Sequence, residues 1–152
     1  MLSALDRPPF PGLRWTGPDQ WHVTLSFLGA VAEDDVGLVA SGLAGLEAPS
    51  AQADLGPAVR RLGRGVLMVP VGGLDGLAAA VAKVVPAGPE AGRPFVGHVT
   101  LARAGRMAVV PATLAGVPME ARWTVGDVAL VRSRLSPRGA RYETVATVGL
   151  RN

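Results

Sequence analysis

The sequence contains no cysteine, only two histidines and no long apolar run. Without cysteine the chain can form neither disulfide bonds nor thiolate metal sites. This fits a reducing compartment, and we expect a cytoplasmic protein. No apolar segment reaches the roughly 20 residues of a membrane-spanning helix. The opening residues, MLSALDRPPFPG, do not have the basic and then apolar layout of a secretory signal.

What the chain does contain is typical of one globular domain. Its 152 residues are 49% apolar, which is enough to bury a core and excludes a disordered chain. The formal net charge is +3, from 15 basic and 12 acidic residues, and nearly all the cations are arginine. Two origins of this excess stay open: a genome that favours arginine codons, which composition alone supports better, or a partner rich in phosphate. No change in composition marks a boundary, so we expect a single domain over residues 1–152.

Helical and extended patterns alternate along the chain. Residues 32–48 and 74–85 have apolar residues at helical spacing: Val36, Val39, Ala40, Leu43 and Leu46 in the first segment, and Leu74, Leu77, Ala78, Val81 and Val85 in the second. The first segment has its acidic residues in the opening turn, where the helix dipole favours them. Extended segments are predicted at residues 13–15, 21–29, 51–55, 65–71, 97–105, 120–125, 127–135 and 142–150. Residues 56–65 are predicted to be turn-rich, and residues 86–97 to be a loop. This order favours an α+β or α/β fold.

Each histidine is followed by the same three residues. His-Val-Thr-Leu occurs at residues 22–25 and again at residues 98–101. Alternate side chains of a strand share a face, so His22 and Thr24 would lie together, as would His98 and Thr100, with valine and leucine opposite. An imidazole can give or take a proton near neutral pH, and a threonine hydroxyl can donate a hydrogen bond to an anionic oxygen. Two such pairs facing each other suit an in-line displacement at phosphorus, in which one histidine activates the nucleophile and the other protonates the leaving oxygen.

Three alternative roles for the motifs are less well supported. A single His-x-Thr on a strand is usually a surface or core position without chemistry. A second copy of the tetrapeptide, however, arises by chance only roughly once in three thousand at typical residue frequencies. A zinc site wants three or four ligands, and the chain has no cysteine and no second histidine four residues from either motif. A serine–histidine–acid triad with Ser26 lacks a nucleophile elbow and an acid placed to orient the imidazole.

On these motifs the chain resembles the two-histidine (2H) phosphoesterase superfamily, and most of all its bacterial RNA 2′,3′-cyclic phosphodiesterase branch, also called 2′-5′ RNA ligase-like. LRWTGPDQWHVTLSFLG, with Arg14 and Trp15 before the histidine, is similar to the first-motif region. RPFVGHVTLAR is similar to the second, although the family usually has proline where Gly97 stands. VALVRSRLSPRGARYETVATVGL resembles the C-terminal strand pair, including its Gly-x-x-Tyr turn. The resemblance extends over about four-fifths of the chain.

The resemblance implies an α+β fold of two pseudo-symmetric lobes, each a mainly antiparallel sheet with helices outside, around a central cleft. It implies hydrolysis of a 2′,3′-cyclic phosphate at an RNA or nucleotide end to a 2′-phosphate, with no metal or other cofactor. In the family the first-motif histidine is the proton donor and the second is the acceptor, which assigns these roles to His22 and His98, with Thr24 and Thr100 holding the phosphate oxygens. The two motifs are nearly symmetric, so the residues alone leave the roles open. A non-catalytic module of the same fold that binds RNA ends or nucleotides, and RNA ligation in the reverse direction, also stay open.

Further residues are weaker candidates for contacts with RNA. Strict alternation would place Arg103 on the face opposite His98, away from phosphate. Two arginine clusters are either solvated surface or a rim that attracts the RNA backbone; they are Arg60, Arg61 and Arg64, and Arg132, Arg134, Arg138 and Arg141. Tyr142 or Trp15 could stack on a base or could equally belong to the core.

The N-terminal region departs from the family pattern. The family opens with a strand of the RLFVA kind and a helix, whereas here only MLSALDRPPFPG precedes Leu13. We expect this strand–helix unit to be shortened, with LSALD, residues 2–6, as a relic of the strand. If the strand is largely absent, a sheet edge and an apolar face are exposed, which favours self-association or lower stability. If MLSALD still supplies the strand and RPPFPG connects it directly to LRW, the lobe is shortened but closed.

Overall fold

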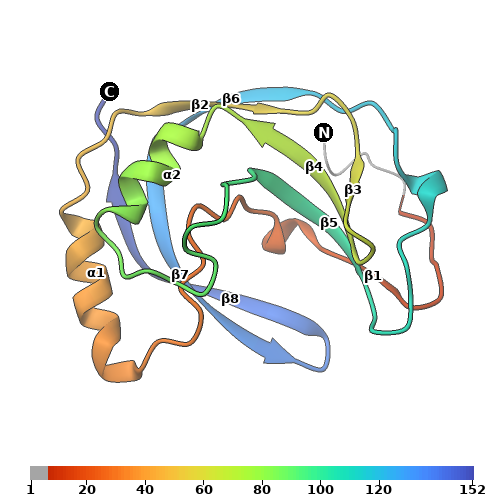
Figure 1. Ribbon diagram of the computed structural model, residues 1–152, viewed down its shortest axis with the longest axis horizontal. Coiled ribbons are helices and arrows are strands. Elements are labelled where there is room, and N and C mark those ends of the chain that lie inside the picture. The colour runs from red at the N-terminus through yellow and green to blue at the C-terminus, as the bar shows by residue number, and fades with distance from the viewer. Residues whose placement is uncertain (1–6) are drawn as a thin grey trace. The chain divides into compact units, whose positions relative to one another are not determined.

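The structure is a computed structural model, and it describes residues 7–152 (Figure 1). The relic strand expected at residues 2–6 therefore lies outside the described residues. The α-helices are α1 (Val36–Ala44) and α2 (Asp75–Ala82), and the 3-10 turns are η2 (Pro18–Gln20), η3 (Glu33–Asp35) and η4 (Ala112–Leu114). The strands are β1 (Leu13–Trp15), β2 (Ala51–Leu55), β3 (Arg60–Leu62), β4 (Val66–Gly72), β5 (His98–Ala104), β6 (Ala121–Val125), β7 (Asp127–Ser136) and β8 (Gly139–Gly149). Within this part of the chain no helix has the length and apolar character needed to span a membrane.

The chain folds into two compact units. Among the described residues, the first contains residues 7–23, Asp54–Gly72 and Val96–Trp123, and the second contains Thr24–Ala53, Gly73–Phe95 and Thr124–Asn152. β5 pairs antiparallel with β1 and β4, β4 pairs antiparallel with β2 and β3, and β7 pairs antiparallel with β8. Antiparallel ladders together with two helices make an α+β fold, as expected from the resemblance, and decide against the α/β alternative.

β5 is the central strand of the first unit. It lies between β1 and β4, and the other edge of β4 pairs with β3 and with the end of β2. Side chains from both faces of β4 and β5 are buried, and Leu67, Val69 and Leu101 are at most 1% exposed. Val59 and Val110, which lie outside the strands, are equally buried. This core holds β5 rigidly, and β5 carries the second histidine motif.

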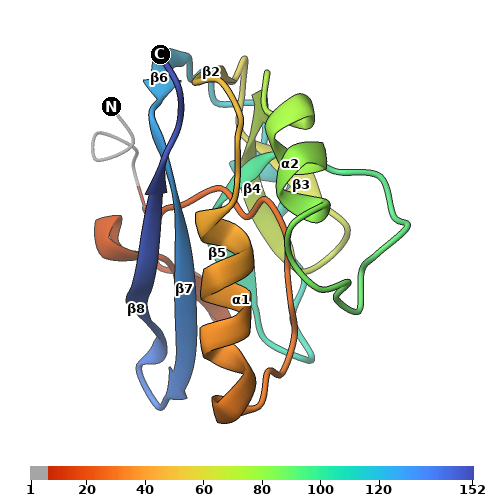
Figure 2. The same cartoon turned by 90° about the vertical axis from the view of Figure 1, so that its left-hand side faces the viewer.

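The second unit contains both α-helices and the β7–β8 hairpin (Figure 2), and α1 contacts β8 of that hairpin. α1 buries Val39 and Leu43, and α2 buries Leu77, Ala78 and Val81. All five positions were predicted from helical spacing, so the apolar faces of both helices are confirmed.

Gly139 determines where β8 begins. Ser136 pairs with Gly139, so Pro137 and Arg138 form a two-residue turn between the strands. Gly139 has a φ of +107°, which glycine adopts without a steric penalty. The Ser136 hydroxyl also donates to the Gly139 carbonyl oxygen (2.7 Å). β8 therefore starts three residues before the predicted start at residue 142.

Two predictions about strands are wrong. Residues 21–29 do not form a continuous strand, because only Val23 pairs, in a single antiparallel bridge with Val99. A strand persists only where a neighbour supplies a continuous ladder of backbone hydrogen bonds, and here the ladder is limited to this one bridge. Residues 56–65 are not all turn, because β3 pairs with β4 across three residues. Two exposed arginines in so short a strand leave no alternating apolar pattern to detect.

Candidate active site

β5 presents the second motif from the core of the first unit. Val99 and Leu101 are 4% and 1% exposed, so one face of the strand is anchored among apolar side chains. His98 and Thr100 are half-buried and lie on the other face. The predicted division of this motif between an apolar face and a polar face is therefore present in the fold.

The first motif is placed by one bridge. Val23 pairs antiparallel with Val99. In an antiparallel pair, the residue before one partner lies opposite the residue after the other, so His22 lies across from Thr100. Val23 shares the face of the buried Val99, which directs His22, its neighbour in the chain, to the other face. The exposed His22 and the half-buried His98 thus share one face of the sheet, called here the histidine face.

Thr16 holds the segment that leads to His22 against β5. Its backbone N–H donates to the Leu101 carbonyl oxygen (2.8 Å), and its hydroxyl donates to the Thr100 carbonyl oxygen (2.8 Å). The indole N–H of Trp21 in turn donates to the Thr16 hydroxyl (3.0 Å). This chain of bonds ties the residue before His22 to the backbone of the second motif. Thr16 was not among the predicted site residues, because a threonine that bonds to backbone leaves no sequence pattern.

Both imidazoles make the same local hydrogen bond. Nδ1 of His22 lies 2.7 Å from the carbonyl oxygen of Gln20, and Nδ1 of His98 lies 2.8 Å from that of Val96; each carbonyl is two residues before its histidine. A carbonyl oxygen only accepts, so each Nδ1 carries a proton. Nε2 is then the nitrogen that accepts a proton in the neutral ring and donates one in the cation. Either ring can therefore serve as acid or base through Nε2.

Thr24 differs from Thr100 in its exposure and in its local structure. It is exposed, it lies one residue past the Val23 bridge, and it is the first residue of the second unit. It keeps its two-residue spacing from His22 without being part of a strand. Ser26, the serine of the rejected triad, is half-buried in the same irregular segment. Among residues 7–152, no three histidine, cysteine, aspartate or glutamate side chains gather as a metal site.

Arg103 lies on the histidine face, so the prediction that it lies opposite His98 is wrong. Met68 pairs with Thr100, and Val66 pairs with Arg103. Two residues of a regular strand that are two positions apart share a face, and so do cross-strand partners. Met68 and Val66 are two positions apart in β4, whereas their partners Thr100 and Arg103 are three positions apart in β5. The additional residue in β5 is Leu101, which forms a bulge. The bulge shifts the alternation by one and was not visible in the sequence.

The first arginine cluster is divided between the two faces of the sheet. Arg60 pairs with Met68, the partner of Thr100, and so lies on the histidine face. Arg61, the next residue, lies on the opposite face, where its guanidinium donates to the Val110 carbonyl oxygen (3.4 Å).

The second arginine cluster is partly neutralised within the second unit. Arg132 donates to Glu33 (2.8 Å), and Arg134 lies 3.8 Å from Glu143. The proposal that this cluster attracts RNA stays a prediction, as does base stacking by Tyr142.

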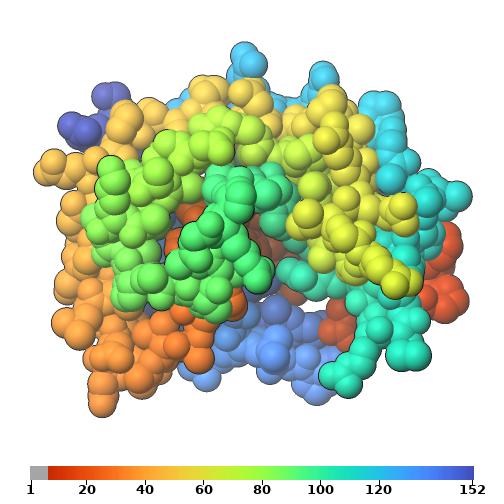
Figure 3. Space-filling view, in the orientation of Figure 1, coloured from red at the N-terminus to blue at the C-terminus, as the bar shows by residue number. Residues whose placement is uncertain are grey.

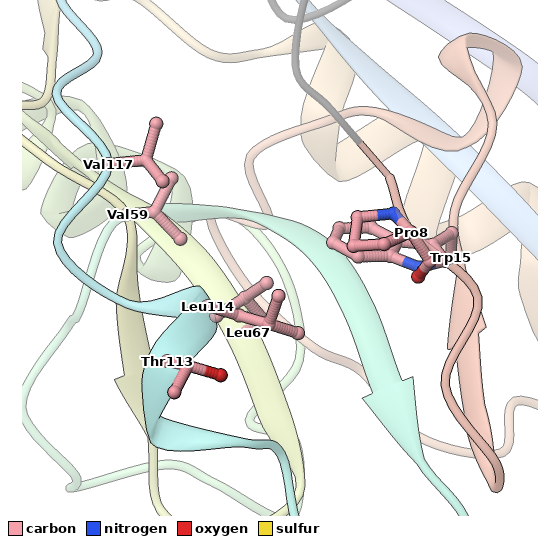
Figure 4. A pocket seen from close by; sticks show the side chains of 7 residues that line it. All are labelled: Pro8, Trp15, Val59, Leu67, Thr113, Leu114 and Val117. Carbon is pink, nitrogen blue, oxygen red and sulfur yellow. The ribbon is translucent and has the colours of Figure 1, made fainter.

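Trp15 belongs to the core side of the sheet. It pairs with Ala102 and lines a cavity of about 220 Å³ together with Val59 and Leu67 (Figure 4). Its indole N–H donates to the carbonyl oxygen of Pro8 (2.9 Å). This is the face opposite the histidines, so Trp15 is a packing residue and not a platform for a base beside them.

An antiparallel sheet that carries two imidazoles, each with a hydroxyl two residues on, has the features of a two-histidine phosphoesterase. The family model described as LigT like phosphoesterase matches residues 3–56. An RNA 2′,3′-cyclic phosphodiesterase of Thermus thermophilus is 34% identical to this chain over an alignment 170 positions long. The alignment covers 94% of this chain and 78% of that relative. The chain therefore belongs to the LigT-like phosphoesterase family.

Solved structures agree with this assignment. The protein TT0787 of Thermus thermophilus superposes with a TM-score of 0.74 at 27% identity, over 95% of this chain and 85% of its own. E. coli LigT in complex with ATP superposes with a TM-score of 0.70 at 27% identity, over 95% and 83% of the two chains. E. coli LigT in complex with 3′-AMP, at 23% identity and a TM-score of 0.67, supports the fold alone.

Proposed function

We propose that this protein hydrolyses the 2′,3′-cyclic phosphate at the end of an RNA or nucleotide to a 2′-phosphate. The observation that carries the proposal is the placement of His22 and His98 on one face, each with Nδ1 bonded to a backbone carbonyl. A module that only binds nucleotides would need neither proton-transfer group. The 34% identity to an RNA 2′,3′-cyclic phosphodiesterase supports the same reaction.

The reaction needs one imidazole in each protonation state. Neutral His98 accepts a proton from water through Nε2, and the water oxygen forms a bond to phosphorus. The bond between phosphorus and the ribose O3′ breaks, and the His22 cation donates its Nε2 proton to O3′. The products are a 2′-phosphate and a 3′-hydroxyl. The assignment of His22 as donor and His98 as acceptor follows the family pattern and is part of the proposal.

Thr100 and Thr24 are proposed to hold the non-bridging phosphate oxygens. Thr100 lies across from His22 and two residues from His98, so it shares the histidine face with both. Thr24 has the same spacing from His22, and its place in the site rests on that spacing. Hydroxyl donors that meet the charge developing on the non-bridging oxygens lower the barrier more than they tighten binding.

Incubation with a nucleoside 2′,3′-cyclic phosphate tests the proposal directly. Phosphorus NMR distinguishes the cyclic ester from the 2′- and 3′-phosphates, and we expect the 2′-phosphate as the product. The matched control is the variant that carries both His22→Asn and His98→Asn, purified in the same way. Failure to convert cyclic phosphates of all four nucleosides and of a short oligoribonucleotide would contradict the proposed function.

A further inference from the structure

Positive charge is concentrated on the unit that carries the histidines. Among residues 7–23, 54–72 and 96–123 there are eight arginines and three carboxylates, a net charge of +5. The second unit has seven basic and eight acidic residues, a net charge of −1. One of the three carboxylates, Asp54, is bonded to Arg122. The modest charge of the whole chain thus hides a strongly basic unit, which attracts polyanions.

Three of these arginines share the histidine face. Arg14 of β1 is the direct cross-strand partner of Arg103, so two guanidinium groups extend from neighbouring positions. Arg60 of β3 shares the ladder of Met68 and Thr100. All three arginines are exposed, and β3 lies at the surface (Figure 3, yellow).

An anion that lies between the guanidinium groups of Arg14 and Arg103 can accept charge-assisted hydrogen bonds from both, because the two residues are direct cross-strand partners. A phosphate suits this position, since its non-bridging oxygens are strong acceptors and guanidinium groups bind them in a bidentate way.

The spacing on the sheet fits a chain of phosphates. Along the strands, Arg103 is two ladder steps from Thr100, which is about 6.6 Å. Consecutive phosphates of an extended RNA strand are separated by a similar distance. Across the strands, Arg60 is two strands from Thr100, or about 9.6 Å. A phosphate at Thr100 would thus have a second phosphate within reach of the Arg14–Arg103 pair.

We propose that Arg14 and Arg103, flanked by Arg60, form a subsite for the internucleotide phosphate that precedes the terminal cyclic phosphate. This inference rests on the proposed function and deepens it, because it makes an RNA end, rather than a mononucleotide, the preferred substrate. The terminal nucleoside lies between the two phosphate sites, and the RNA leaves the site over the C-terminal end of β5.

Steady-state kinetics on two substrates test the subsite. A dinucleotide that ends in a 2′,3′-cyclic phosphate has one internucleotide phosphate, and a nucleoside 2′,3′-cyclic phosphate has none. We expect a higher kcat/KM for the dinucleotide, mainly through KM, since an interaction made equally in ground and transition state changes KM and not kcat. Arg14→Gln should reduce this preference roughly tenfold, the low end for a hydrogen bond to a charged group. Arg60→Gln should reduce it less.

Arg61→Gln is the matched control. It removes the same charge one residue from Arg60, on the opposite face of the sheet, and should leave the substrate preference unchanged. The preference of the wild-type protein for the dinucleotide should also weaken as the salt concentration rises. In a variant that has lost one phosphate contact, the slope of log affinity against log salt concentration should be smaller by about 0.7. Equal kcat/KM for both substrates, or an equal effect of Arg14→Gln on both, would overturn the subsite.

The subsite and the proposed function can fail separately. If the wild-type protein hydrolyses neither substrate, the proposed function is wrong. Equilibrium binding of a dinucleotide with a terminal 2′-phosphate then still decides on the subsite. Weaker binding by Arg14→Gln than by Arg61→Gln supports it, and equal binding by the two variants refutes it.

Discussion

Replacing His98 with asparagine separates the chemistry of this residue from its part in the fold. The asparagine side-chain N–H can replace Nδ1–H as the donor to the Val96 carbonyl oxygen, 2.8 Å away in the wild type. No atom of asparagine replaces Nε2, so the variant cannot accept a proton from water. We expect His98→Asn to lower kcat roughly 10²- to 10⁴-fold, the usual contribution of one acid–base group, which corresponds to about 2.7–5.5 kcal/mol of barrier.

The fold should tolerate the same change. His98 is half-buried, and its bond to the Val96 carbonyl contributes about 0.5–1.5 kcal/mol to stability. Even His98→Ala, which removes this bond, should lower the melting temperature by only about 1–6 °C in a chain of this size. His98→Asn should lower it less. Activity and stability are thus expected to change by very different amounts.

The assay follows the 2′-phosphate formed from a nucleoside 2′,3′-cyclic phosphate, with thermal melting of each variant alongside. His22→Asn should behave as His98→Asn does, because its Nδ1 makes the equivalent bond to the Gln20 carbonyl. The double variant should lose much less than the product of the two single losses, because the acid and the base act as a unit. A folded His98→Asn protein that turns over within threefold of the wild type would refute the two-histidine mechanism.

Three further outcomes are expected. The dependence of kcat/KM on pH should be bell-shaped, because one imidazole must be neutral and the other protonated; a rate that changes in only one direction between pH 4 and 9 would contradict this. Turnover should continue in excess EDTA, since the proposed steps use only the chain's own residues, and loss of activity that a divalent ion restores would count against them. Leu67 lies in β4, between β3 and β5, and is 1% exposed. Leu67→Ala should therefore lower the free energy of unfolding by about 2–5 kcal/mol. Leu135→Ala, at a position 90% exposed, should change the free energy of unfolding by less than about 0.5 kcal/mol in chemical denaturation, and equal losses in the two variants would contradict the burial argument.

The parts of this protein that the sequence determined are those that depend on local spacing. The apolar positions in and beside α1 and α2 recur at helical intervals, and the structure buries seven of the ten residues that this spacing selects, with Val36, Ala40 and Val85 half-buried. The extent of β2 was also predicted correctly. The repeated His-Val-Thr-Leu identified both histidines and the family, because the chemistry depends on residue types and on a two-residue period.

The remaining features depend on partners that are distant in the chain, and only the tertiary structure decided them. His22 lies on the histidine face because Val23 bridges to Val99, which is 76 positions further along the chain. Arg103 joins that face because Leu101 bulges against β4, and β3 exists because β4 offers it a ladder. A bulge or a bridge is stabilised by backbone hydrogen bonds to another strand, and every residue type except proline can both donate and accept them. Their positions are therefore not encoded in the pattern of the side chains and appear only when the strands meet.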